Sequence, residues 1–177
     1  REYGVSECFV GASTNTMSAK IVQVSMHYLP FQSGGQQLYV HELLAIARQL
    51  GKDAMVIQPD RGITIPEYVM VTPALRGLRL LGPHASWFWF TVALSRYRKV
   101  LADAEAVISH YSFHYPGIPH AAYSIVLSHG VDWPEKPRKF VDRYKLWISN
   151  KCARERVPVV ANDTDYLRRV GITNALG

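Results

Sequence analysis

The sequence predicts an α/β fold, a Rossmann-like doubly wound parallel sheet with helices on both faces. Short apolar runs alternate with amphipathic helical segments along most of the chain, a pattern typical of strand–helix–strand crossovers. A chain of 177 residues with 48% hydrophobic content has the size of one cored domain. No internal repeat or low-complexity linker interrupts the alternation. We therefore expect a single sheet.

The first half of the pattern contains three predicted strands and one helix. Residues 21–26 form a short β-branched run, which is typical of a buried strand. Apolar residues then recur at helical spacing over 36–50, and Gly51 ends that helix. Two further strands are predicted at 54–59 and 67–72, and a proline closes each of them.

The second half continues the alternation. An aromatic-rich helix is predicted over roughly 85–101, followed by strands at 106–110 and 124–129. Residues 138–156 form a helix in which aromatic and aliphatic side chains alternate with basic ones. The last predicted elements are a strand at 158–162 and a helix that begins within 165–170.

Residues 1–19 fit none of these patterns. They are polar and rich in Gly, Ser and Thr, and the segment Met17-Ser18-Ala19-Lys20 resembles a natural protein start. We interpret 1–19 as an N-terminal extension or cloning remnant, with an extra N-terminal strand as the alternative. The Rossmann-like domain is then predicted over 20–177.

The charge balance favours an anionic partner. Twenty Lys and Arg against fourteen Asp and Glu give a net charge of +6. Nucleic acid is disfavoured, because no run of five like charges and no RNA-binding or zinc-finger signature occurs. The N-terminus lacks a secretory layout, and the most apolar stretch, 85–94, is far short of the ~20 residues that span a bilayer. We therefore predict a cytoplasmic protein, with peripheral contact at the membrane face as an option.

Polar residues follow the predicted strands at the edge where ligands of parallel sheets bind. Gly34-Gly35 precedes a helix, where glycines let a phosphate approach the backbone N–H groups, although a simple turn and helix cap would look the same. Neither a dinucleotide fingerprint nor a P-loop is present. The other residues at this edge are His27, 110–114, His129-Gly130 and Asn162-Asp163.

Histidines dominate this edge. His129 could donate a hydrogen bond to a sugar or phosphate or transfer a proton, or it could be purely structural. His110, His114 and His120 suggest a metal, but no Cys, His or Glu partners have zinc-site spacing. We predict no metal site.

The aromatic run at 87–90 lies near several arginines. Aromatic and basic side chains together are typical of a membrane-surface or lipid-acceptor site. The alternative is a buried helix at an interface. The residues of the predicted lipid-facing surface are Arg76, Arg79, Trp87 and Trp89.

Taken in order, these segments resemble family 4 retaining glycosyltransferases. A strand followed by Pro-x-x-x-Gly-Gly and the helix at 39–51 resembles the family's opening. The segments 102–110, 125–130 and 159–169 are similar to its later strands, including one that ends in His-Gly. The resemblance covers about residues 20–171. Each motif is short, and the ordered set carries the likeness.

The resemblance implies the GT-B architecture, two Rossmann-like domains facing a cleft, of which this chain is the N-terminal, acceptor-side half. It implies that Gly34 and Gly35 approach the diphosphate of a nucleotide diphospho-sugar and that His129 is catalytic. No further cofactor is implied. The acceptor would be a sugar, a lipid-linked molecule or a small molecule, and its contacts would be His27, Tyr28, His110 and Tyr111.

One departure from the family is large. The nucleotide-sugar domain with its paired glutamates is absent from these 177 residues, so a C-terminal donor domain is an expected partner and the chain alone is expected to be inactive. The alternative is a non-catalytic Rossmann-like module that binds an anionic metabolite or a partner protein. A flavodoxin-like or response-regulator domain is disfavoured, because no acidic cluster follows the first strand.

Overall fold

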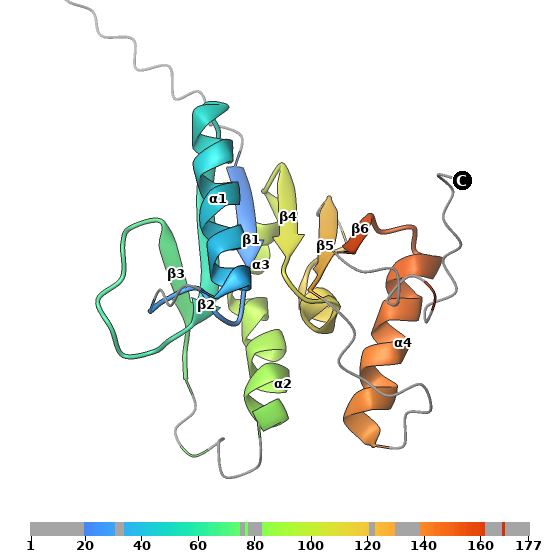
Figure 1. Cartoon of the computed structure of the whole chain (residues 1–177). Coiled ribbons are helices and arrows are strands. Elements are labelled where there is room, and N and C mark those ends of the chain that lie inside the picture. Colours follow the sequence, from blue (N-terminus) through green and yellow to red (C-terminus); the bar gives the residue numbers. More distant parts are fainter. Residues whose placement is uncertain are drawn as a thin grey trace, which may run out of the picture.

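A computed structural model describes residues 20–30, 34–74, 77, 83–120, 123–129, 139–161 and 168. These form an all-parallel sheet of six strands in the order β3-β2-β1-β4-β5-β6, with β3 and β6 at opposite edges (Figure 1). The order reverses between β1 and β4, which confirms the predicted doubly wound sheet. The strands are β1 Lys20–Val24, β2 Asp53–Pro59, β3 Val69–Thr72, β4 Ala106–Ser109, β5 Ser124–Ser128 and β6 Val159–Ala161.

Helices cover both faces of this sheet. One face carries α1, and the other carries the helices that follow β3. The buried residues of α1 belong to one hydrophobic cluster, and those of the later helices belong to two others. The short helix η3 packs against both α2 and α4, which places these on one side. The helices are α1 Gly35–Gln49, α2 Pro83–Ala93, η2 Leu94–Tyr97, α3 Arg98–Ala102, η3 Ser112–Gly117 and α4 Phe140–Arg154.

The alternation of side chains along each strand divides the core between the two faces. On β2, Ala54 and Val56 pack against α1, whereas the next residue, Ile57, joins the cluster beneath α2 and α3. On β1, Val22 and Val24 also belong to that second cluster. Gln23 of β1 therefore points to the α1 face, where its amide meets the α1 backbone.

The predicted helix over 85–101 is wrong in one respect, because it is broken. A 3₁₀ segment, η2, separates α2 from α3. A 3₁₀ turn aligns residues three apart, so Leu94 and Tyr97 both stay on the core side and Leu101 reaches the same cluster. The helix η3 was not predicted. Residues 1–19 and most of 165–170 lie outside the described residues.

None of the helices in the described ranges is long and apolar enough to cross a membrane. The aromatic helix α2 has eleven residues, about half of the ~20 that a bilayer requires.

The thiol of Cys152 on α4 is expected to react with a thiol reagent only when the chain unfolds. Cys152 is fully buried, and burial raises the pKa of its thiol to about 12, so the reactive thiolate is scarce at neutral pH. Cys8, the other of the chain's two cysteines, would also be labelled, so labelling rates with and without urea are measured on Cys8→Ser protein. Rapid labelling of the folded Cys8→Ser protein would contradict the placement of Cys152 in the core.

Candidate functional site

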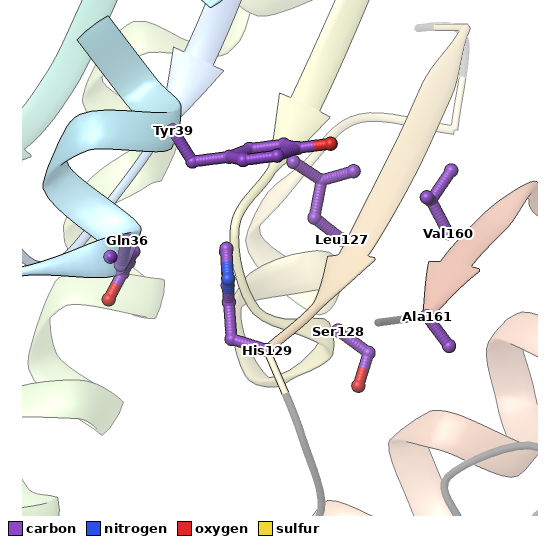
Figure 2. Close-up of a pocket in the computed structure, with 8 residues that line it drawn as sticks. Gln36, Tyr39, Leu127, Ser128, His129, Val160 and Ala161 are labelled. Atoms are coloured by element: carbon purple, nitrogen blue, oxygen red, sulfur yellow. The ribbon is translucent and has the colours of Figure 1, made fainter. Parts of the chain in front are cut away.

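A pocket of about 460 Å³ opens where α1 begins and where β5 and β6 end (Figure 2). It lies at the carboxyl edge of the parallel strands, where such sheets bind their ligands. The pocket brings together two predicted site residues, Gly35 and His129, from distant parts of the sequence. Its described lining is Gly35, Gln36, Tyr39, Leu127, Ser128, His129, Val160 and Ala161.

The first turn of α1 forms one wall of the pocket. Gly34 is its N-cap in an extended conformation, and no side chain caps the helix among the described residues. No acidic residue occupies the first turn. The N–H groups at the start of a helix attract anions. No atom of the described residues would lie within 4 Å of a Cβ atom added at Gly35, so these residues do not require glycine at this position.

His129 forms the opposite wall. Figure 2 shows its side chain extending from the end of β5 toward Tyr39, which reaches over from α1. The two rings meet edge to face, with centroids 6.0 Å apart and planes 84° apart. Burial lowers the pKa of His129, because a charged imidazolium loses solvation there. The neutral imidazole is therefore the resting form at neutral pH.

His110 lies behind His129 and is fully buried. Its Nδ1 lies 3.4 Å from Nε2 of His129, and its Nε2 lies 2.7 Å from Oε1 of Gln23. Burial, and secondarily the neighbouring His129, lower the pKa of His110 to about 3. The predicted contact between His110 and an acceptor is not tested by the structure, but His110 is absent from the described pocket lining.

Strand register explains why these side chains meet. Gln23 of β1 pairs with Ile108 of β4, and Ile108 pairs with Ile125 of β5. Side chains alternate along a strand, so residues two or four positions further on, His110 and His129, point to the same face as Gln23. That face is the one covered by α1.

A second polar connection fixes the start of α1. The Tyr111 hydroxyl donates to Oε1 of Gln36 at 2.9 Å, and Nε2 of Gln36 donates to Oγ of Ser25 at 3.2 Å. The Ser25 hydroxyl donates to the carbonyl of His27 at 3.2 Å. The Tyr111 ring also approaches His129, at 5.7 Å between centroids. Gln36 is thus held in place before any ligand arrives.

The other predicted acceptor residues lie elsewhere. Tyr28 is 2% exposed and belongs to the core beneath α1, where its hydroxyl lies 3.4 Å from Nδ1 of His41. His27 is exposed, with its Nδ1 3.3 Å from a guanidinium nitrogen of Arg61. Partial desolvation of the imidazole, and secondarily the charge of Arg61, lower the pKa of His27 even though the residue as a whole is exposed. The pockets lined by the described residues do not bring His27, Tyr28, His110 and Tyr111 together.

The aromatic run at 87–90 packs against neighbouring elements of the fold. The ring of Trp87 lies 5.0 Å from Tyr111 and 5.3 Å from Phe113, and the Trp89 indole N–H donates to the carbonyl of Pro73 at 2.7 Å. These contacts agree with the buried-helix interpretation of α2. Arg76 and Arg79, the basic members of the predicted lipid-facing surface, lie outside the described residues.

Within the described ranges, no group of three or more His, Cys, Asp or Glu side chains could hold a metal ion. The hydrogen-bond partners of the His110 ring are His129 and Gln23. His114 lies in the aromatic cluster, with its Nδ1 3.0 Å from the Thr91 hydroxyl. The Thr91 hydroxyl also donates to the Trp87 carbonyl at 3.0 Å, so it accepts from His114.

Gln23, Gln36 and Tyr39 are among the residues of this site that were not predicted. The signal for Gln23 is present in the sequence, because an amide within an otherwise apolar strand must find a buried partner. Gln36 and Tyr39 offer no comparable signal. They face the pocket only because α1 begins at the same edge of the sheet at which β5 ends.

No protein-family model matches this chain, and no curated protein matches it in sequence. The assignment of a function therefore rests on the geometry of the pocket together with the resemblance in its motifs.

Proposed function

We propose that the pocket binds the diphosphate of a nucleotide diphospho-sugar and that the chain is the acceptor-side half of a retaining glycosyltransferase. One observation carries the proposal. The start of α1, which no described side chain caps, and the imidazole of His129 line the same pocket, although they lie more than ninety residues apart in the sequence. Backbone N–H donors facing a titratable side chain suit an anionic group.

Gly35 has the position that such a ligand needs. Its backbone lies at the first turn of α1, and the space around it is open. Glycine at the start of a helix contributes less stability than alanine would. A residue that the fold does not require and that weakens the helix is best explained by close approach of a ligand to the backbone.

His129 would act on the far side of the diphosphate. In the transfer step, the bond between the sugar and the diphosphate breaks, and the leaving oxygen gains negative charge. Hydrogen-bond donors already aimed at that oxygen stabilise the transition state. The α1 N–H groups and a protonated His129 are donors of this kind, while the acceptor hydroxyl and its base remain unassigned.

A second candidate is a binding module without catalysis. The described lining contains neither a Lys or Arg nor an Asp or Glu, so His129 is its one titratable group apart from the Tyr39 phenol. Such a lining can hold an anion, but it offers no carboxylate base. The C-terminal donor domain and the acceptor follow from the family resemblance, whereas a cytoplasmic location and peripheral membrane contact follow from the sequence pattern. All four remain predictions.

Replacing Gly35 by alanine is expected to weaken donor binding without harming the fold. The methyl group would occupy the space above the first turn, where we place the diphosphate, and no atom of the described residues lies within 4 Å of it. We expect at least about tenfold weaker binding of UDP or GDP, equivalent to roughly 1.4 kcal/mol. Calorimetric titration with each nucleotide measures it.

Gly62→Ala serves as the control, because Gly62 lies in the bend after β2, where its φ of +68° strains an alanine, and it is not part of the described pocket lining. It should leave nucleotide affinity unchanged. Equal affinity of the wild type and Gly35→Ala would refute the diphosphate site. The chain should bind a nucleotide sugar without turning it over. Transfer or hydrolysis of UDP- or GDP-sugars by the chain alone would contradict the division of the enzyme into two halves.

A further inference from the structure

A buried chain of hydrogen bonds runs behind the pocket, from the backbone of α1 to His129. Its inner members, Gln23 and His110, are both fully buried. Polar side chains in such a place are costly unless they are paired. Each of them has a partner on both sides, and the chain crosses from α1 through β1 and β4 to the end of β5.

The direction of each hydrogen bond follows from the one at the α1 end of the chain, where the acceptor is a backbone carbonyl. The carbonyl of Val40 can only accept, so the group 3.2 Å from it is the Gln23 amide nitrogen. Oε1 of Gln23 then faces Nε2 of His110 at 2.7 Å, and this nitrogen must carry the proton. Nδ1 of neutral His110 is therefore an acceptor, and the proton that it shares with His129 belongs to Nε2 of His129.

The arrangement of the two rings fits this assignment. Their planes differ by only 7°, and their centroids are 5.6 Å apart, well beyond the 3.4 Å between the two nitrogens. The imidazoles thus lie side by side with nitrogen facing nitrogen, rather than one above the other. Because the pKa of His110 is about 3, His110 keeps its acceptor nitrogen throughout the neutral range.

We propose that Gln23 and His110 are positioning residues that hold His129 with its proton on Nε2, so that Nδ1 is the atom of His129 that exchanges a proton with a ligand in the pocket. Nδ1 makes no hydrogen bond among the described residues. The assignment of this tautomer in the free protein does not depend on which ligand the pocket binds. The ligand part of the inference rests on the proposed function.

This arrangement makes anion binding depend on pH. The titratable groups facing His129 are Tyr39 from α1 and His110 and Tyr111 from the segment after β4, and none of them is a Lys or an Arg. A proton on Nδ1 would therefore supply the positive charge of the pocket. Burial lowers the pKa of His129 in the free protein, and a bound anion should raise it again. His129 should therefore take up a proton when the anion binds, and the anion should bind more tightly as the pH falls.

The tautomer can be read by ¹⁵N NMR of the imidazole rings at pH 7.5. We expect ring N–H protons on Nε2 of both His110 and His129, protected from exchange with water, and an unprotonated Nδ1 in each ring. A proton on Nδ1 of His129 in the wild-type protein would overturn the proposal on its own.

Gln23→Leu tests the positioning role. Without the amide oxygen, His110 is free to place its proton on Nδ1, which would then donate to His129 and move the His129 proton to its own Nδ1. We expect the protected Nε2 signals to disappear and the Nδ1-protonated form of His129 to become measurable. Persistence of both Nε2 signals in folded Gln23→Leu protein would refute the role of Gln23.

Gln58→Leu is the matched control. Gln58 is 1% exposed and bonds both the N–H and the carbonyl of Leu29, so its loss also removes buried hydrogen bonds from a strand. It does not touch the histidine pair, and the Nε2 signals should remain. If Gln23→Leu does not fold, the wild-type tautomer still decides the proposal.

Inorganic pyrophosphate separates this inference from the proposed function. In the wild type, the probe should shift Nδ1 of His129 toward its protonated form and leave Nε2 unchanged, and Gln23→Leu should bind it about tenfold more weakly. Absence of binding, with the predicted tautomer intact, would count against the diphosphate site alone. If pyrophosphate binds and the proton is found on Nε2 of His129 but not on Nδ1, the positioning proposal is refuted, whereas the anion site is supported.

Discussion

Replacing Gly117 by alanine is expected to destabilise the folded chain by about 3 kcal/mol. Gly117 ends η3 where that helix presses against α2. A Cβ atom there would overlap the backbone oxygen of Thr91 and would lie 3.0 Å from Cδ1 and 3.2 Å from Cβ of Leu94. The overlapping oxygen belongs to the backbone, so no change of rotamer can relieve the clash, and α2 or η3 must move.

Urea unfolding monitored by circular dichroism measures this loss. Gly35→Ala is the matched control, since the same added methyl meets nothing within 4 Å and should change the free energy of unfolding by less than about 1 kcal/mol. A Gly117→Ala protein as stable as the wild type would show that α2 and η3 are not packed as closely as described.

Lowering the pH from 6.5 to 5 is expected to remove about 3 kcal/mol from the free energy of unfolding. The cause is two buried histidines, His110 and His114, whose pKa values are both lowered to about 3, mainly by burial. In the unfolded chain they titrate near 6.5. Between these values the unfolded state binds more protons than the folded state, so stability is fully present above about pH 6.5 and is lost as the pH falls.

His114→Phe is expected to remove about half of this pH dependence. Nε2 of His114 is buried and has no hydrogen-bond partner among the described residues, and its ring already lies among Trp87, Phe90 and Phe113. A phenyl ring should fit at neutral pH within about 1.5 kcal/mol of the wild type.

Phe113→Leu is the control for this prediction. It disturbs the same aromatic cluster without removing a titrating group, so it should lower stability equally at pH 6.5 and pH 5. Urea titrations at these two pH values suffice. If the free energy of unfolding depends on pH in the same way in His114→Phe and wild-type protein, then His114 takes up its proton over the same pH range in the folded and unfolded chains. Its described burial would then be wrong.

The strands were the most predictable part of this fold. Runs such as 54–59 are short, β-branched and closed by proline, and they lie buried on both faces of the sheet. The helix over 85–101 was less predictable, because its break at η2 depends on which residues must reach the core together. The helix η3 carries no helical pattern of its own. It is held by packing against α2 and α4, which local sequence does not encode.

The site was predictable in position and only partly in composition. The rule that ligands bind at the carboxyl ends of parallel strands identified Gly35 and His129, and the pocket contains both. The same rule also selected His110 and His27, since it cannot tell a side chain in the crevice from one buried behind it or turned to solvent. That distinction depends on strand register and on the path of α1.

The strand order also has a consequence for the speed of folding. β1 pairs with β2 across a single helix, but its other neighbour is β4, so Ile21 must find Ala106 across half of the chain. Contacts this distant in sequence slow folding, because the loop entropy is lost before the contact is gained. Lys20–Thr72 can assemble through nearby contacts, whereas joining β4 to β1 closes the largest loop. The rate of refolding should therefore respond most to substitutions of the residues that pair between β1 and β4.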